Sequence, residues 1–226
     1  MSGSEFNKVI IFDCDGTLAD GQHMITDSMN LCLDRFGMER LDHADVRRII
    51  GLSLMEAFQV LKPELSTDDH AALTEGYKKA FFDLRSSEDF TAEPLYPDTI
   101  EVLKELDGKG YCLAVATGKS LRGLRRVLSQ HDILDMFVSL QTSDHHPSKP
   151  HPSMVQTAIL DAGSHPDQAI VIGDTSYDMQ MAKSAGAHAL GVSWGYHEVP
   201  ELVNAGATKV AHSFREIPAM VSDLMA

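Results

Sequence analysis

Four short clusters of polar residues carry the chemistry that this sequence could perform. Each cluster follows a run of apolar residues, and two of the clusters contain paired acids. They are Asp13, Asp15, Gly16 and Thr17; Thr117, Gly118 and Lys119; Ser148, Lys149 and Pro150; and Gly173, Asp174 and Asp178. If the apolar runs are neighbouring parallel strands, four carboxylates, a hydroxyl and an ammonium group converge on one edge of a sheet, where open sheets of this kind bind ligands.

Carboxylates held this close together repel one another, which is costly unless a cation neutralises them. Oxygen ligands without His or Cys suit a hard ion, most naturally Mg²⁺. With a metal and Lys149 in place, the site becomes a receptor for an anion. One carboxylate can then attack phosphorus as a nucleophile, while a second acts as general acid and then as general base.

Each cluster alone has a plainer interpretation. Asp13 and Asp15 could form a turn with helix-capping acids, and Thr117-Gly118 could simply start a helix. Asp174 and Asp178 could be a cap and an exposed helical acid, and the Lys149 loop could be a solvated loop. Their joint occurrence after successive apolar runs favours the functional interpretation.

The apolar runs predict the elements that position these clusters. Val9–Phe12, Leu113–Ala116, Phe137–Leu140 and Ala169–Ile172 are typical of buried strands. Segments with helical periodicity alternate with the later strands, and a helix near 176–185, a strand near 188–192 and a last helix near 214–225 follow. The prediction is an α/β fold, with a Rossmann-like parallel sheet and helices on both faces.

The stretch from Gly21 to Glu93 breaks this alternation. It contains only helical patterns, near residues 24–36, 44–50, 54–61 and 68–84. We therefore predict a catalytic core formed by residues 1–20 and 94–226, and an inserted all-helical cap domain over residues 21–93. Pro94 and Pro97 would stiffen the return connection. Whether residues 1–6 belong to the native fold is left open by the sequence.

Composition excludes several classes of partner. The 226 residues carry 19 Lys and Arg against 33 Asp and Glu, for a net charge of −14. Nucleic acids and anionic lipids require a basic face, so we expect neither as a partner. No apolar run approaches the length of a membrane span, and the N-terminus has no secretory pattern. Three cysteines without a C-x-x-C pair fit a reducing compartment. We expect a cytoplasmic protein.

At these residues the sequence resembles the haloacid dehalogenase-like hydrolases, and within them the phosphatases with a helical cap inserted after the first strand. The resemblance extends over essentially the whole chain from Val9. It implies that Asp13 is the nucleophile that forms an aspartyl-phosphate. It also implies that Asp15 protonates the leaving alcohol and later deprotonates the attacking water. Thr117 and Lys149 match the hydroxyl and ammonium groups that hold the transferring phosphoryl oxygens.

The resemblance also implies a Mg²⁺ site. Asp174 resembles the metal ligand, joined by the carboxylate of Asp13 and the backbone carbonyl of Asp15. Asp178 is expected to complete the metal site through a bound water, or to orient Lys149.

Five further residues are predicted to contact the substrate. Gly16 and Thr17 match the turn after the nucleophile, whose backbone N–H groups can face phosphate, and Gly118 lies beside Thr117. Arg47 and Arg48 could reach a substrate carboxylate when the cap closes. The alternative for the two arginines is a solvated basic face at a helix end.

Residues at a few positions indicate which activities within the family fit this chain. An acid at Asp15 disfavours dehalogenases and phosphonate hydrolases. Sugar-phosphate mutases of this type tend to carry Lys and Arg where this chain has Ile50 and Leu54. The pattern is closest to phosphoglycolate phosphatase-like members, which act on small phosphate monoesters.

Other residues have weaker functional interpretations. His23 could contact substrate, or be an ordinary linker residue. His145, His146 and His151 are more simply a polar loop than a metal site. Cys14 is expected to point into the strand packing, and Trp194 to pack in the core or at the rim of the pocket.

The leading hypothesis is a Mg²⁺-dependent phosphatase for a small phosphate monoester, monomeric or homodimeric, with cap hinges near Asp20-Gly21 and residues 93–97. The alternatives are a phosphomutase, in which an alcohol accepts the phosphoryl group, and a non-catalytic regulatory binder that keeps the fold.

Overall fold

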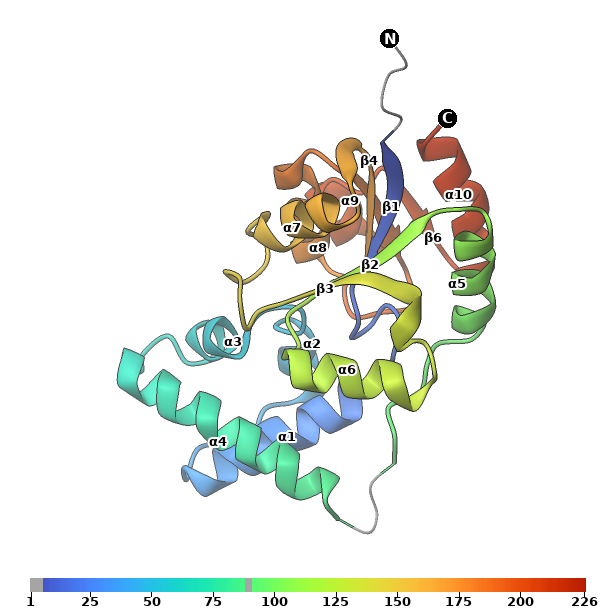
Figure 1. Ribbon diagram of the computed structural model, residues 1–226. Helices are drawn as coiled ribbons and strands as arrows, with labels where there is room; N and C mark the ends of the chain where they lie inside the picture. Colours follow the sequence, from blue (N-terminus) through green and yellow to red (C-terminus); the bar gives the residue numbers. More distant parts are fainter. Residues whose placement is uncertain (1–5, 88–90) are drawn as a thin grey trace.

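A six-stranded parallel sheet forms the centre of the part of the chain that the computed structural model describes, residues 6–87 and 91–226 (Figure 1). The strand order is β3-β2-β1-β4-β5-β6. The strands are β1 Asn7–Phe12, β2 Cys112–Thr117, β3 Phe137–Thr142, β4 Ser164–Gly173, β5 His188–Val192 and β6 Lys209–Ala211. Because β2 and β4 lie on opposite sides of β1, the order reverses at β1, and this is where such sheets bind ligands.

Alternation along β1 explains why both faces of the sheet are covered. Ile10 and Phe12 pack on one face, and Val9 and Ile11 pack on the other. The first face is covered by α5 Thr99–Gly108, α6 Leu121–Gln130 and α10 Ile217–Leu224, and the second by α7 Ser153–Asp161, α8 Ser176–Ala185 and α9 Val199–Ala205. Figure 1 shows α7, α8 and α9 on one side of the sheet and α5 and α10 on the other.

Four helices between β1 and α5 form a separate apolar cluster below the carboxyl edge of the sheet (Figure 1). They are α1 Gln22–Arg35, α2 His43–Arg47, α3 Leu54–Leu61 and α4 Thr67–Arg85. Ser53 and Ser66 cap α3 and α4 by accepting a backbone N–H of the first turn. We call residues 21–93 the helical insertion. The α/β fold with inserted helices is confirmed, while the exact boundaries stay a prediction.

The two connections to the helical insertion lie side by side. Ala19 and Leu95 form an antiparallel bridge. The Asp20 N–H donates to the Pro94 carbonyl at 2.9 Å, and the Tyr96 N–H donates to the Leu18 carbonyl at 3.0 Å. The chain therefore leaves and re-enters the core through one short paired segment.

The structure differs from the sequence prediction mainly after β5. Helix α9 and strand β6 were not predicted there. The last predicted helix is divided into a 3₁₀ turn, Phe214–Glu216, and α10, which has Pro218 in its first turn. The helix predicted over 44–50 is the shorter α2. The sequence leaves open whether residues 1–6 belong to the native fold, and residues 1–5 lie outside the described residues.

No helix within the described residues is both long enough and apolar enough to cross a membrane.

Candidate active site

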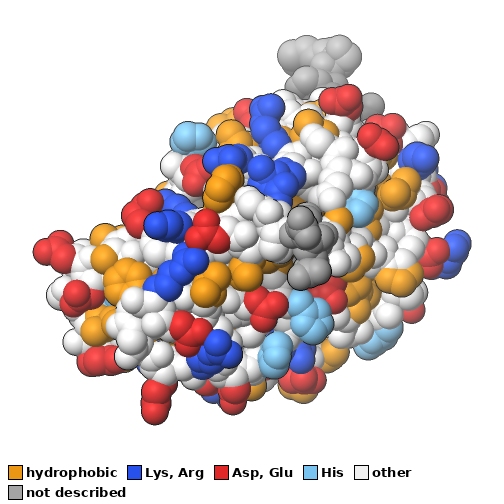
Figure 2. Space-filling model, turned by 90° about the horizontal axis from the view of Figure 1, so that it is seen from below, with side chains coloured by type: hydrophobic (Ala, Val, Ile, Leu, Met, Phe, Trp, Pro, Cys, Tyr) orange, Lys and Arg blue, Asp and Glu red, His pale blue; other side chains and the backbone are white. Residues whose placement is uncertain are grey.

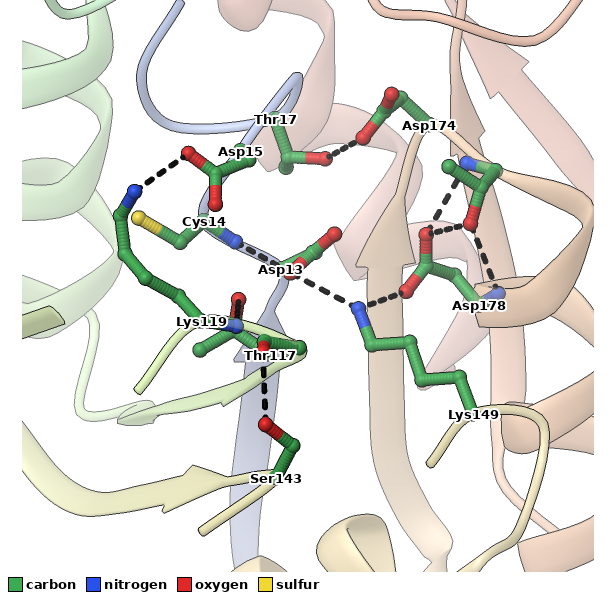
Figure 3. A network of polar contacts seen from close by, with 12 residues as sticks. Asp13, Cys14, Asp15, Thr17, Thr117, Lys119, Ser143, Lys149, Asp174 and Asp178 are labelled. Atoms are coloured by element: carbon green, nitrogen blue, oxygen red, sulfur yellow. Dashed lines mark hydrogen bonds and ion pairs between the residues drawn. The ribbon is translucent and has the colours of Figure 1, made fainter. Parts of the chain in front are cut away.

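The carboxyl ends of the central strands bring the predicted residues together (Figure 3). Asp13 directly follows β1, Thr117 is the last residue of β2, and Asp174 directly follows β4. Lys149 comes from the loop after β3. Asp13, Thr117, Lys149 and Asp174 are each at most 2% exposed, so the site is built inside the protein.

Lys149 lies between two carboxylates. Its Nζ atom is 2.9 Å from Asp13 Oδ1 and 2.7 Å from Asp178 Oδ1. Asp13 Oδ1 also accepts the Cys14 N–H at 2.7 Å. Burial raises the pKa of Asp13 to about 7, although Lys149 acts to lower it. Burial acts to lower the pKa of Lys149, but Asp13 and Asp178 outweigh it and raise that pKa, so the lysine is a cation.

Asp174 is held by hydrogen bonds to both of its oxygens. Thr17 Oγ1 donates to Oδ1 at 2.8 Å, and the Tyr196 N–H donates to Oδ2 at 2.9 Å. Burial, followed by the charges of Asp13 and Asp178, raises the pKa of Asp174. A Cβ atom at Gly16, whose φ is +84°, would lie 2.2 Å from the Asp174 carboxylate, so this approach requires glycine.

Asp178 is fixed at the start of α8. Its Oδ2 accepts from the Thr175 N–H at 3.1 Å and from Thr175 Oγ1 at 2.6 Å. Thr175 in turn caps the helix. Asp178 Oδ1 is thereby left to bind Lys149. No role was predicted for Thr175, although its spacing to Asp178 is that of a capping box.

The donor set fits a hard divalent cation. One oxygen each from Asp13, Asp174 and Asp178 lies within 4.8 Å of the others. Among the described residues, Asp13 Oδ2 is buried and has no hydrogen-bond partner. Three buried carboxylates face one ammonium group, so the excess negative charge favours a cation, and the oxygen-only donors suit Mg²⁺.

The Asp15 side chain points elsewhere. Its Oδ1 lies 3.0 Å from Lys119 Nζ, and the same Nζ atom lies 3.2 Å from Glu93 Oε2. In the described residues, the group of close carboxylates does not include Asp15. The Asp15 carboxylate is therefore separate from that group, and the role of its backbone carbonyl as a metal ligand stays a prediction. No individual role was predicted for Lys119, although it belongs to the cluster with Thr117, and none was predicted for Glu93.

A cavity of about 540 Å³ opens from these residues toward the helical insertion. Asp13, Asp15 and Thr117 line its inner part, and apolar side chains such as Met29 and Phe81 line its walls. Gly118 also lines it, and a Cβ atom there would lie 2.6 Å from the Leu52 carbonyl. The end of β2 and the helical insertion are therefore in close contact at Gly118.

The structure does not bring Arg47 and Arg48 into this cavity. Neither is among the described residues that line it. Arg47 Nη2 donates to the carbonyls of Gly195 and Tyr196, each at 3.0 Å. Arg48 is exposed, and its carbonyl accepts from the Tyr177 hydroxyl. The Arg47 side chain instead holds the helical insertion against the loop after β5, and the Arg48 backbone contacts α8.

The histidines have ordinary structural partners. His23 is exposed and packs edge-on against His43. His146 hydrogen-bonds Ser153 and Gln141, and burial lowers its pKa.

Cys14 and Trp194 lie where packing was expected. Cys14 is buried in the apolar cluster of one sheet face. Trp194 packs against Phe214 and donates its indole N–H to the Thr17 carbonyl.

The chain matches the model of one known protein family. The profile described as haloacid dehalogenase-like hydrolase matches residues 10–192. The chain therefore belongs to the haloacid dehalogenase-like hydrolase family. The predicted resemblance is confirmed, and with it the prediction of a hydrolytic enzyme.

Individual relatives match nearly end to end. A probable phosphatase, IndB, from Dickeya dadantii (strain 3937) is 32% identical over 92% of this chain and 91% of its own length. Pyrophosphatase PpaX from Bacillus pumilus (strain SAFR-032) is 30% identical over 86% of each chain. A phosphoglycolate phosphatase from Vibrio vulnificus (strain CMCP6) is 29% identical over 93% and 94%.

Solved structures share the fold. The crystal structure of a predicted phosphatase from Clostridium acetobutylicum superposes with a TM-score of 0.84 at 25% identity, covering 97% of this chain and all of the other.

Proposed function

We propose that this chain is a Mg²⁺-dependent phosphatase that hydrolyses a small, phosphoglycolate-like phosphate monoester through an aspartyl-phosphate on Asp13. The observation that carries the proposal is the arrangement of Asp13. Lys149 and the Cys14 N–H hold one of its oxygens, while the other has no partner among the described residues. Asp13 also lines the cavity, so a substrate can reach it.

In the first step, Asp13 Oδ2 attacks phosphorus and the bond between phosphorus and the leaving oxygen breaks. Protonated Asp15 gives its proton to that oxygen, and the alcohol departs. The Thr117 hydroxyl and the Lys149 ammonium hold phosphoryl oxygens whose charge grows in the transition state. The Gly16 and Thr17 N–H groups, predicted to face phosphate, instead donate within the turn to the Ala19 and Cys14 carbonyls at 2.9 Å and 3.3 Å. The Gly118 N–H is therefore the backbone donor that we propose for the phosphoryl group.

In the second step, the Asp15 carboxylate takes a proton from water as the water oxygen attacks the same phosphorus. The bond between phosphorus and Asp13 breaks, inorganic phosphate leaves, and Asp13 is again a carboxylate. Asp15 is again protonated, so the cycle balances.

Asp13, Asp174 and Asp178, with the Asp15 carbonyl, are the residues that would hold Mg²⁺. When bound, the ion supplies the positive charge that lets a phosphate approach these carboxylates. Thr17 and Tyr196 keep Asp174 oriented for that role.

The helical insertion is proposed to act as a cap that excludes water and selects the leaving group. Relatives named as phosphoglycolate phosphatases support a small phosphate monoester as substrate. The cavity of about 540 Å³ also has room for leaving groups larger than glycolate, so the test must include them. A small-molecule substrate, a monomer or homodimer, and a cytoplasmic location complete the proposal.

Phosphate release tests the proposal. The assay uses 4-nitrophenyl phosphate, phosphoglycolate, glycerol phosphate and pyrophosphate, with Mg²⁺ and with EDTA, for wild type, Asp13→Asn and a surface control, Asp167→Asn, whose side chain is 80% exposed. We expect release that requires Mg²⁺ and is lost only in Asp13→Asn. A hexose phosphate is incubated in parallel, and its conversion to an isomer without release of free phosphate would indicate a mutase. Bound Mg²⁺ without turnover of any compound would indicate a non-catalytic binder.

A further inference from the structure

Lys119 forms a second buried charge cluster outside the group of metal-binding carboxylates. Its Nζ atom lies 3.0 Å from Asp15 Oδ1 and 3.2 Å from Glu93 Oε2. The side chains of Lys119, Asp15 and Glu93 are 9%, 10% and 8% exposed, so bulk water screens them little. The Phe81 ring of the helical insertion lies 5.9 Å from the same ammonium group.

The three charged residues come from three separate parts of the chain. Asp15 follows β1, Lys119 follows β2, and Glu93 lies on the return connection from the helical insertion. Gly21 packs against the cluster, because a Cβ atom there would lie 2.7 Å from Asp15 Oδ1 and 3.3 Å from Glu93 Oε2. Glu93 is itself anchored, since its carbonyl hydrogen-bonds His131 Nε2 at 2.8 Å. These contacts give Lys119 one defined position.

The ion pair determines how the Asp15 carboxyl group is turned. Lys119 holds Oδ1, and Figure 3 shows the other oxygen of Asp15 directed back toward the side on which Asp13 lies. Without the ammonium group, two buried carboxylates would face each other across Gly21 and would separate or take up water. Asp15 would then lose the orientation that proton transfer requires, since the donor must lie within hydrogen-bond reach of the leaving oxygen.

We propose that Lys119, anchored by Glu93, is a positioning residue that orients the Asp15 carboxyl group toward the leaving-group oxygen. This inference rests on the proposed function, in which Asp15 is the general acid. It gives Glu93 a role as well, because the cation that orients the acid is held at the point where the chain re-enters the core.

Two other roles for Lys119 make different predictions. A lysine that contacts a phosphoryl oxygen would matter equally for every phosphate ester. A purely structural lysine would lower the amount of folded enzyme, again for every substrate alike. A lysine that positions the general acid matters only where the leaving group needs a proton, so the leaving group distinguishes the roles.

The experiment compares two leaving groups in the full chain. The 4-nitrophenolate ion leaves without protonation, whereas the alkoxide of glycerol phosphate does not. The value of kcat/KM reports only the steps up to alcohol release, so the later role of Asp15 as base does not enter. The variants are Lys119→Met and Glu93→Gln. The control is Lys109→Met, which removes a lysine from a surface pair with Glu105.

For Lys119→Met we expect kcat/KM to fall about 100-fold with glycerol phosphate and at most about threefold with 4-nitrophenyl phosphate. Glu93→Gln should shift the ratio of the two values in the same direction by about fivefold, and Lys109→Met should leave it unchanged. Glu93→Gln keeps the side-chain shape, so it provides the test if Lys119→Met does not fold.

Equal losses with both substrates, or no loss with either, would overturn the positioning role while wild-type turnover upholds the phosphatase. No Mg²⁺-dependent turnover by wild type would overturn the proposed function, and this inference with it.

Discussion

Two lysines of this protein, one fully buried and one nearly so, each lie between two carboxylates, but their surroundings differ. Lys149 is fully buried beside Asp13 and Asp178, and a third carboxylate, Asp174, lies in the same group. Lys119 is slightly exposed, and its two carboxylates, Asp15 and Glu93, come from the connections to the helical insertion. The number of carboxylates differs: three lie around Lys149, an excess of negative charge that would favour a metal, whereas Lys119 faces two and holds both as ion pairs.

The largest effect on activity is expected from removing Asp174, the third carboxylate near Lys149. Asp174→Asn keeps both ion pairs of Lys149 but takes away a metal ligand. We expect kcat/KM to fall at least about 1,000-fold at saturating Mg²⁺, measured as phosphate release. The Asp167→Asn control should retain wild-type activity. A loss smaller than tenfold for Asp174→Asn would contradict its place in the metal site.

Removing each lysine compares the two groups directly. Lys149→Met leaves fully buried carboxylates without their cation, so we expect the free energy of unfolding to fall by about 3 kcal/mol. Lys119→Met should cost less, about 1 kcal/mol, because the side chains of Asp15 and Glu93 are 10% and 8% exposed, whereas those of Asp13 and Asp178 are at most 1% exposed. Urea unfolding at pH 8 in EDTA measures both. The comparison fails if Lys119→Met is the more destabilising change.

A third prediction concerns the loop that holds Asp174. Arg47 fixes the carbonyls of Gly195 and Tyr196, and the Tyr196 N–H orients Asp174. Arg47→Met should therefore weaken Mg²⁺ binding about tenfold, measured by titrating activity with Mg²⁺. Arg40→Met is the matched control, because Arg40 pairs with Asp34 on the surface of the helical insertion. Equal affinities in both variants would argue against this link.

The smallest effect is a gain in stability. Burial raises the pKa of Asp13 from 3.8 to about 7, so its ionisation opposes folding when no metal is bound. This cost is absent below pH 4, grows as the pH rises toward 7, and is constant above that. Asp13→Asn should raise Tm in EDTA by several degrees at pH 8 and leave it unchanged near pH 3.5. Calorimetric scans of both proteins at both pH values measure the change in Tm. An equal rise in Tm at pH 3.5 and pH 8 would contradict the prediction.

The sequence allowed prediction of features that depend on local pattern. The strands of the sheet centre are continuous apolar runs because both faces are covered, and polar residues at their ends stand out against them. Helix α9 has only one buried residue, Leu202, and β6 has three residues, so neither produces an apolar run long enough to detect.

Features that depend on contacts between distant segments could not be predicted. Glu93 looks like any linker acid until the fold places it beside Asp15. Tyr196 acts through its backbone N–H, a group that nearly every residue type carries, so no residue type marks it. Arg47 was predicted to reach a substrate carboxylate or to lie on a solvated basic face, but its partners are the carbonyls of Gly195 and Tyr196, and backbone carbonyls leave no mark in a sequence.

The loop around Tyr196 has a consequence for protein engineering. The Tyr196 N–H orients Asp174, yet the Tyr196 side chain is buried in the apolar cluster of the helical insertion, and Arg47 holds the Tyr196 carbonyl from the same side. Grafting another relative's helices onto this core would therefore replace the residues that pack around Tyr196 and Arg47 itself, but would keep the loop that they hold. A functional chimaera would have to carry residues 194–197 together with the transplanted helices, although they lie far apart in the gene.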